Sequence, residues 1–160
     1  MTMFKRLAAA AAMAVALTTG ADAATGCAVP GNANQLAGAI AQGLNAQRRA
    51  NGLRALQFNP RLSESAQVHA CDMARRNFFD HRGSDGSNVQ NRARRVGYRD
   101  CLIAENLAWG YPEPSTIITG WMNSPGHRRN MLLRDVREFG IGITQGPRGP
   151  YWVLVVAKGC

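Results

Sequence analysis

The stretch EFGIGITQGPRGPYWVLVVAK, residues 138–158, decides the fold class of this chain. Two apolar runs, 138–145 and 151–158, flank the turn-forming residues GPRGP. This spacing predicts an antiparallel β-hairpin. The second run carries apolar residues on both faces, which predicts a central strand of the sheet.

The segments upstream of the hairpin have helical periodicity. Leu36, Ile40 and Leu44 form one apolar stripe, so we expect a helix over residues 34–50 that ends at the NG pair 51–52. Further helices are expected after Asn59, at 88–97 and at 114–123, and a strand is expected at 101–110. Helices first and a hairpin last indicate an α+β layered domain.

The helix expected after Asn59 begins with proline, a residue favoured at the first helical position. His69 lies seven residues after Leu62 and therefore shares its apolar stripe. We interpret His69 as a packed helix residue rather than as part of a site.

The N-terminus has the pattern of a secretory signal peptide over residues 1–23. Lys5 and Arg6 precede an apolar run at 7–17, and the sequence ADA that ends at Ala23 matches a cleavage site. The apolar run is too short to span a bilayer. We therefore expect an exported protein, periplasmic or extracellular, with residues 24–160 as one domain and no transmembrane segment.

The chain is strongly basic, with a formal net charge of +9. Its arginines are spread along the sequence and no aromatic residues alternate with them, which argues against specific nucleic-acid binding. For an exported basic protein, the expected counterpart is an anionic envelope component. We expect a monomer, because a domain of this length can bury a sufficient core alone.

Four cysteines, an even number in an exported domain, predict two disulfides with three possible connectivities. Cys27 and Cys160 bracket the domain, and chain termini commonly lie near one another. We therefore expect Cys27–Cys160 and Cys71–Cys101. A lipid anchor on Cys27 is disfavoured, because polar residues separate it from the apolar run and one cysteine would be left unpaired.

Three polar residues stand out as candidates for chemistry: His81, Glu105 and His127. Glu105 interrupts the apolar segment LIAENLAW, where an unpaired carboxylate would cost several kcal/mol, so it must be paired, hydrogen-bonded or exposed in a cleft. Ser124 and Pro125 are expected to begin a short helix as its N-cap and first residue. His127 would then lie in its first turn, where the helix dipole favours a neutral ring.

Six segments of the chain, in order and in spacing, resemble the CAP superfamily, which is named for cysteine-rich secretory proteins, antigen 5 and pathogenesis-related proteins. The resemblance covers residues 36–157 and is closest to the short bacterial branch. The segments are LNAQRRANGL (44–53), FFDHRGSDGSN (78–88), AENLAWG (104–110), WMNSPGHRRNML (121–132), FGIGI (139–143) and YWVLVV (151–156).

The resemblance implies an αβα sandwich with a central antiparallel sheet. It also implies a cleft in which two histidines and two glutamates bind a divalent cation in many members. His81, His127 and Glu105 match three of these ligands, whereas Ser124 occupies the place of the second glutamate. We therefore expect no required cofactor and at most a weakly bound Zn²⁺ on His81, His127 and Glu105, with Ser124 also in the cleft.

Three functions are compatible with this sequence. The favoured one is a non-enzymatic module that binds a small ligand, a lipid or an envelope component in the cleft. The second is a metal-assisted hydrolase, a peptidase or cell-wall enzyme, with His127 or Glu105 as the catalytic base. The third is a structural or signalling protein. Catalysis is disfavoured because one metal ligand and a nucleophile motif are missing.

The three tryptophans have distinct expected environments. Trp121 and Trp152 lie on strongly apolar segments, one helical and one in the central strand, and both are expected in the core. Trp109 precedes Gly110 at a strand end and is expected to be more exposed, at the rim of the cleft.

Overall fold

The computed structural model describes residues 27–160, so the predicted signal peptide at 1–23 lies outside the described residues. The elements are, in chain order, α1 (Ala33–Ala50), β1 (Gln57–Phe58), α2 (Pro60–Arg76), α3 (Val89–Arg95), β2 (Asp100–Trp109), α4 (Pro114–Asn123), α5 (Pro125–Met131), β3 (Glu138–Gly146) and β4 (Gly149–Gly159). The expected helices and strands are therefore present, and the two-residue strand β1 was not anticipated.

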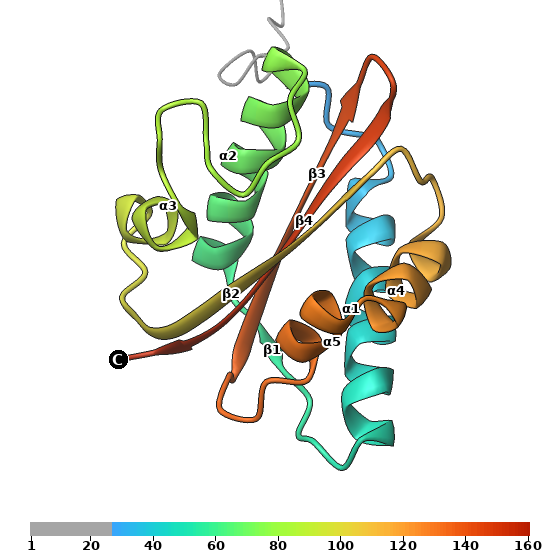
Figure 1. Cartoon of the computed structure of the whole chain (residues 1–160), viewed down its shortest axis with the longest axis vertical. Helices are drawn as coiled ribbons and strands as arrows, with labels where there is room; N and C mark the ends of the chain where they lie inside the picture. The colour runs from blue at the N-terminus through green and yellow to red at the C-terminus, as the bar shows by residue number, and fades with distance from the viewer. Residues whose placement is uncertain (1–26) are drawn as a thin grey trace, which may run out of the picture.

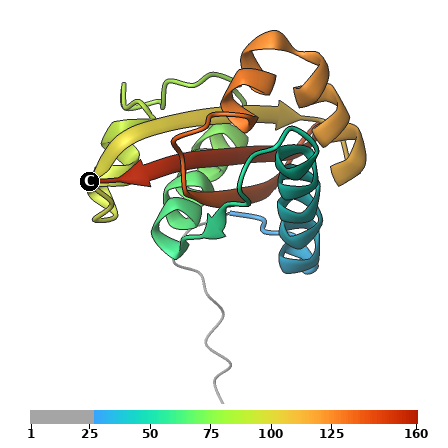
Figure 2. The same cartoon turned by 90° about the horizontal axis from the view of Figure 1, so that it is seen from below.

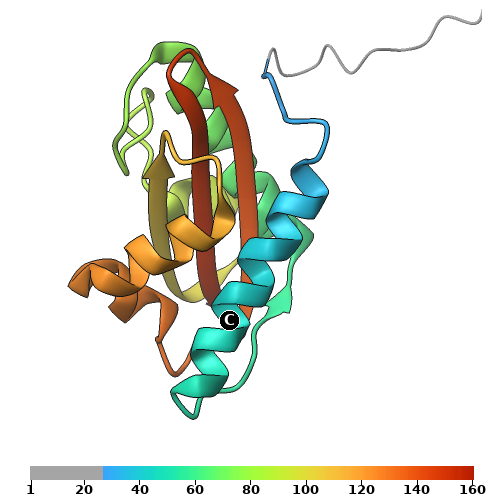
Figure 3. The ribbon, with the colours of Figure 1, turned by 90° about the vertical axis from the view of Figure 1, so that its right-hand side faces the viewer.

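The sheet has the strand order β1-β3-β4-β2. The strands β3 and β4 form the predicted antiparallel hairpin, and β2 pairs with the other edge of β4, also antiparallel. The last strand is therefore central, as its apolar residues on both faces predict, and Figure 3 shows it between β2 and β3. Only β1, at the outer edge of β3, pairs in parallel.

Helices cover both faces of the sheet, which makes the fold an αβα sandwich of the α+β class. Figure 1 shows α2 and α3 on one side of the strands and α1, α4 and α5 on the other. One core contains side chains such as Leu44, Ile118 and Trp152, and the opposite core contains Leu62, Tyr151 and Val155. Each face of β4 thus packs into a different core.

The tryptophan environments follow the expectation. Trp121 is 3% exposed and Trp152 is 1% exposed, both in the core between the sheet and α1, α4 and α5. Trp109, at the end of β2, is only partly buried and packs at the periphery of the other core.

Helix α2 lies directly on β3 because two glycines of the FGIGI segment remove the side chains between them. A Cβ atom on Gly140 would overlap the backbone of Leu62 and Ser63, and one on Gly142 would overlap the backbone of Ala66 and Gln67. This close approach fixes the position of α2 over the sheet.

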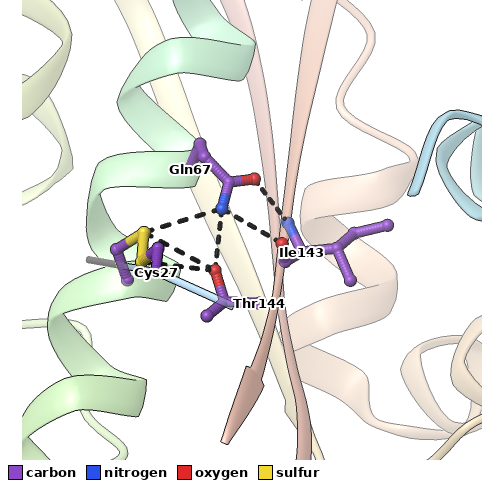
Figure 4. The surroundings of a disulfide bond; sticks show 5 residues. Cys27, Gln67, Ile143 and Thr144 are labelled. Carbon is purple, nitrogen blue, oxygen red and sulfur yellow. Dashed lines mark hydrogen bonds between the residues drawn. A yellow bond between two sulfur atoms is a disulfide. The ribbon is translucent and has the colours of Figure 1, made fainter. Parts of the chain in front are cut away.

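The same approach lets α2 cover the outer edge of β3 beyond the short strand β1. The Ser63 hydroxyl donates to the Ile141 carbonyl. The Gln67 side chain accepts from the Ile143 N–H at 3.0 Å and donates to the Ile143 carbonyl at 3.0 Å, which imitates a neighbouring strand (Figure 4). An edge covered in this way is protected from pairing with another chain.

The predicted disulfide connectivity is wrong. The structure joins Cys27 to Cys71 and Cys101 to Cys160, with Cα–Cα distances of 5.5 and 4.9 Å. The two disulfides close loops with sequence separations of 44 and 59 residues. Each bond contributes about 4 kcal/mol to the free energy of unfolding, because it lowers the conformational entropy of the unfolded chain.

Sheet geometry explains the error. Ala28 bridges to Gln145, near the hairpin turn, whereas Cys160 follows the far end of β4. Eleven residues of β4 span about 35 Å, so the two ends of the described chain cannot meet (Figure 1). Because β2 runs antiparallel to β4, its first residues lie beside the last residues of β4, and this brings Cys101 to Cys160 (Figure 2).

The contact between α2 and β3 predicts an asymmetric response to two glycine substitutions. Gly142→Ala should lower the free energy of unfolding by about 2–3 kcal/mol, because α2 must move off the sheet. Gly38→Ala in α1, where a Cβ meets no atom within 4 Å, should instead raise it by about 0.5–1 kcal/mol through helix propensity. Urea unfolding measures both, and equal effects would contradict the direct contact.

Candidate functional site

Glu105 is a buried carboxylate with a partner on each oxygen. Its side chain, on β2, is 3% exposed. The His81 Nδ1–H donates to Oε1 at 2.9 Å, and the Arg92 Nη2–H donates to Oε2 at 2.7 Å. Glu105 was expected to be paired, hydrogen-bonded or exposed in a cleft, and the structure shows it paired and hydrogen-bonded, with His81 as one partner. Arg92 was not anticipated.

Arg92 joins three parts of the site. From α3, its Nη1 donates to the His81 carbonyl at 3.1 Å and to the Ser87 carbonyl at 2.9 Å. Its Nη2 reaches Glu105. The guanidinium therefore holds both ends of the 81–88 loop against β2, and its side chain is only 3% exposed.

A sequence signal for Arg92 exists in the periodicity of α3. Arg92 follows Val89 by three residues and precedes Val96 by four, so it lies on the apolar stripe of a short helix. An arginine on such a stripe indicates a buried cation that needs an anion. Glu105, an acidic residue within an apolar strand, is the complementary signal.

Helix α2 supports the same loop from beneath. The His69 Nε2–H donates to the Asp80 carbonyl at 2.9 Å, immediately before His81. Asp72 accepts from the Ser84 N–H at 2.8 Å and from its hydroxyl at 2.7 Å. His69 is fully buried, as predicted. Its contact with the backbone next to the site, and its Nε2 position 3.9 Å from Glu105 Oε1, were missed.

His127 lies in the first turn of α5, as predicted. Ser124 has the extended backbone of an N-cap and Pro125 is the first helical residue. The Ser124 side chain, however, makes no capping hydrogen bond, so that part of the prediction is wrong. Its backbone carbonyl accepts from the Arg128 N–H at 2.8 Å instead.

Two asparagine side chains, one buried and one partly buried, hold α5 onto β2. Asn106 donates to the His127 carbonyl at 3.0 Å, and Asn130 donates to the Glu105 carbonyl at 3.1 Å and to Asn106 Oδ1 at 2.9 Å. At the other end of α5, the fully buried Arg48 donates to the carbonyls of Met131 and Leu133. These contacts set the position of the backbone that carries His127.

The pKa values of the two site histidines, His81 and His127, are shifted in opposite directions. The hydrogen bond to Glu105 is the main cause of the raised pKa of His81, whose side chain is 59% exposed. Burial is the main cause of the lowered pKa of His127, and the nearby His81 lowers it further. At neutral pH, His127 therefore carries a neutral ring.

The predicted cleft consists of two hollows rather than one. His81 and Glu105 line a polar hollow of about 370 Å³, together with Asp80, Arg82, Asn88 and Val89. Ser124 and His127 line a larger apolar groove of about 680 Å³ between the end of β2 and helices α4 and α5. The side chains predicted to share one cleft are thus divided between two adjacent surfaces.

The residues of the polar hollow do not fit a divalent cation. Among residues 27–160, no group of three or more His, Cys, Asp or Glu side chains is arranged to hold a metal ion. Both Glu105 oxygens already have partners, and one of these partners is a cation. Ser124 lines the other hollow and supplies no carboxylate.

The sequence comparison places the chain in a family. Residues 42–157 match the CAP family, described as the cysteine-rich secretory protein family, and the chain belongs to it. The YkwD protein of Bacillus subtilis (strain 168) is 33% identical over 108 residues, which are 68% of this chain and 41% of that protein. The membrane protein YlbC of the same organism is 32% identical over 100 residues, 62% of this chain and 29% of its own length. The chain thus spans less than half the length of these two relatives.

Solved structures share the fold. An outer surface protein from Borrelia burgdorferi superposes with a TM-score of 0.74 at 19% identity, over 79% of this chain and 94% of that one. An extracellular protein containing an SCP domain from Bacillus anthracis str. Ames gives a TM-score of 0.72 at 24% identity, over 78% of this chain and 41% of that one.

The disulfides agree with a CAP protein that functions outside the cytoplasm. All four cysteines form disulfides, which persist in oxidising compartments. Within residues 27–160, no helix combines the length and the apolar character needed to cross a membrane.

The opposite pKa shifts predict a distinct order of titration. In an NMR titration, His81 should titrate above its ordinary pKa of 6.5 and His127 below it. His81 then stabilises the fold below pH 6.5, and this contribution is lost as the pH rises through its raised pKa. His127 stabilises it above pH 6.5, and this contribution is lost as the pH falls through its lowered pKa. A midpoint for His81 below that of His127 would contradict the assigned hydrogen bond to Glu105.

Proposed function

We propose that this chain is an exported, non-enzymatic binding module that takes a small lipid-like molecule or envelope component into the apolar groove. The observation that carries the proposal is the groove itself. Its volume of about 680 Å³ lies within the range of small-molecule sites, and aromatic side chains line it beside a few polar groups.

The lining of the groove is suited to an elongated apolar ligand. The lining includes the aromatic side chains of Phe79, Trp109 and Tyr111, with the almost fully buried Ile117 and Trp121 beside them. Phe79 and Tyr111 are 45% and 55% exposed, which is a large exposure for two aromatic side chains that line one groove. A ligand in the groove would bury both.

Polar groups at one end of the groove would orient the ligand. Asn123, Ser124 and His127 lie there, and His127 is neutral at pH 7, so it offers a hydrogen bond rather than a fixed charge. The net charge of +9 would attract the protein to an anionic envelope surface, where such ligands occur. The proposal also holds that residues 1–23 are a signal peptide that directs export and that the protein is a monomer.

The geometry of Glu105 argues against the hydrolase alternative. A general base must reach the proton that it removes. The Glu105 side chain is instead 3% exposed and is held by His81 on one oxygen and by the Arg92 cation on the other, so it faces its partners rather than a substrate. His127 has no hydrogen-bonded nucleophile among the contacts of its ring in the described chain, so the groove favours binding over catalysis.

Gly120 offers a direct test, because it lines the groove and a Cβ built there meets no atom within 4 Å. Gly120→Leu should fill the groove and weaken the binding of a fluorescent long-chain carboxylic acid by at least about tenfold. Gly38→Leu is the matched control, since Gly38 is equally open but lines a hollow between α1 and β3. Its affinity should equal that of the wild type.

Two outcomes would contradict the proposal. One is wild-type affinity in Gly120→Leu together with no lipid-like compound in mass spectra of the purified protein. The other is cleavage of peptides or peptidoglycan by the wild type that disappears in a folded His127→Ala variant, which would establish the hydrolase.

A further inference from the structure

We infer that the Arg92 guanidinium is the resident cation of Glu105, which it contacts from behind the polar hollow, and that it excludes divalent cations from this carboxylate. The polar hollow contains His81 and is separate from the apolar groove, so this role of Arg92 does not depend on the ligand proposed for the groove. The position, the burial and the hydrogen bonds of Arg92 all support it.

The Arg92 guanidinium occupies the place beside Glu105 where a metal ion bound to this carboxylate would have to lie. The Nη2 atom lies 2.7 Å from Oε2, and the two side chains are each 3% exposed. The other oxygen, Oε1, accepts from His81 at 2.9 Å and has His69 Nε2 at 3.9 Å. Glu105 is therefore surrounded by nitrogen atoms of three side chains, one of which is permanently charged.

The guanidinium is fixed and cannot easily move aside for an ion. Its Nη1 donates to two carbonyls, those of His81 and Ser87, which lie at opposite ends of one loop. Helix α3, which carries Arg92, is itself fixed at its start by the reciprocal cap between Asn88 and Asn91. Displacing Arg92 would break these contacts and leave a buried cation without an anion.

Charge also disfavours a second cation. Arg92 and Glu105 neutralise each other, so the pair carries no net charge. Asp80 and Arg82, which line the hollow beside Glu105, are likewise one of each sign. A divalent ion would therefore meet no net negative charge, and the like charge of Arg92 would repel it from the carboxylate.

The prediction is that zinc binding appears only when the guanidinium is removed. Arg92→Gln keeps hydrogen-bonding capacity but no charge, and it should bind zinc at least about tenfold more tightly than the wild type. Arg92→Lys retains the positive charge and is the matched control, with the weak or absent binding of the wild type. His81→Ala in the Arg92→Gln background should remove the gain.

Isothermal calorimetry with zinc chloride measures the affinities, and imidazole NMR resonances show whether His81 is the ligand. Equal zinc binding by the wild type and a folded Arg92→Gln variant, including none by either, would overturn the inference. If Arg92→Gln fails to fold, measurements on the wild-type protein alone still test the inference. Millimolar zinc should leave its thermal unfolding midpoint and the His81 resonances unchanged, and a zinc-dependent rise that His81→Ala abolishes would overturn it.

Discussion

The ion pair between Arg92 and Glu105 connects helix α3 and the 81–88 loop to strand β2 of the sheet. A carboxylate in a strand covered on its inner face by a core has to be neutralised where it stands. The guanidinium that neutralises Glu105 also holds the carbonyls at both ends of the 81–88 loop. This buried contact, which joins α3, the loop and β2, therefore helps to fix the position of His81 and the shape of the polar hollow.

Helix α2 is the second element on which both the fold and the site depend. Gly140 and Gly142 let its backbone rest on β3, and its polar side chains cover the strand edge. Further along, His69 and Asp72 hold the loop that carries His81. The Cys27–Cys71 disulfide also joins this helix to the N-terminal segment. The loop that carries His81 therefore rests on a helix that is held at several points.

The sequence predicts the helices, the strands and the buried residues better than it predicts which residues contact one another. Periodicity in residues 34–50 and the apolar run 151–158 are local properties, and they indicated the helices, the central strand and the buried tryptophans. Which cysteines meet depends on strand direction and on the length of β4, which no local pattern contains. The periodicity of α3 indicates that Arg92 is buried, but its pairing with Glu105 depends on the packing of α3 against β2, and no local pattern contains that packing. The division of the predicted cleft into two hollows arises only from the packed structure.

A double-mutant cycle on Arg92 and Glu105 tests the central role of the ion pair most directly. The free energy of unfolding is measured in urea for the wild type, Arg92→Met, Glu105→Gln and the double variant. Each single change should cost about 3–5 kcal/mol, because it leaves a buried charge without its partner. The double variant should cost less than the sum of the two, with a coupling energy of about 1–3 kcal/mol. Effects that add to within about 0.5 kcal/mol would contradict the account.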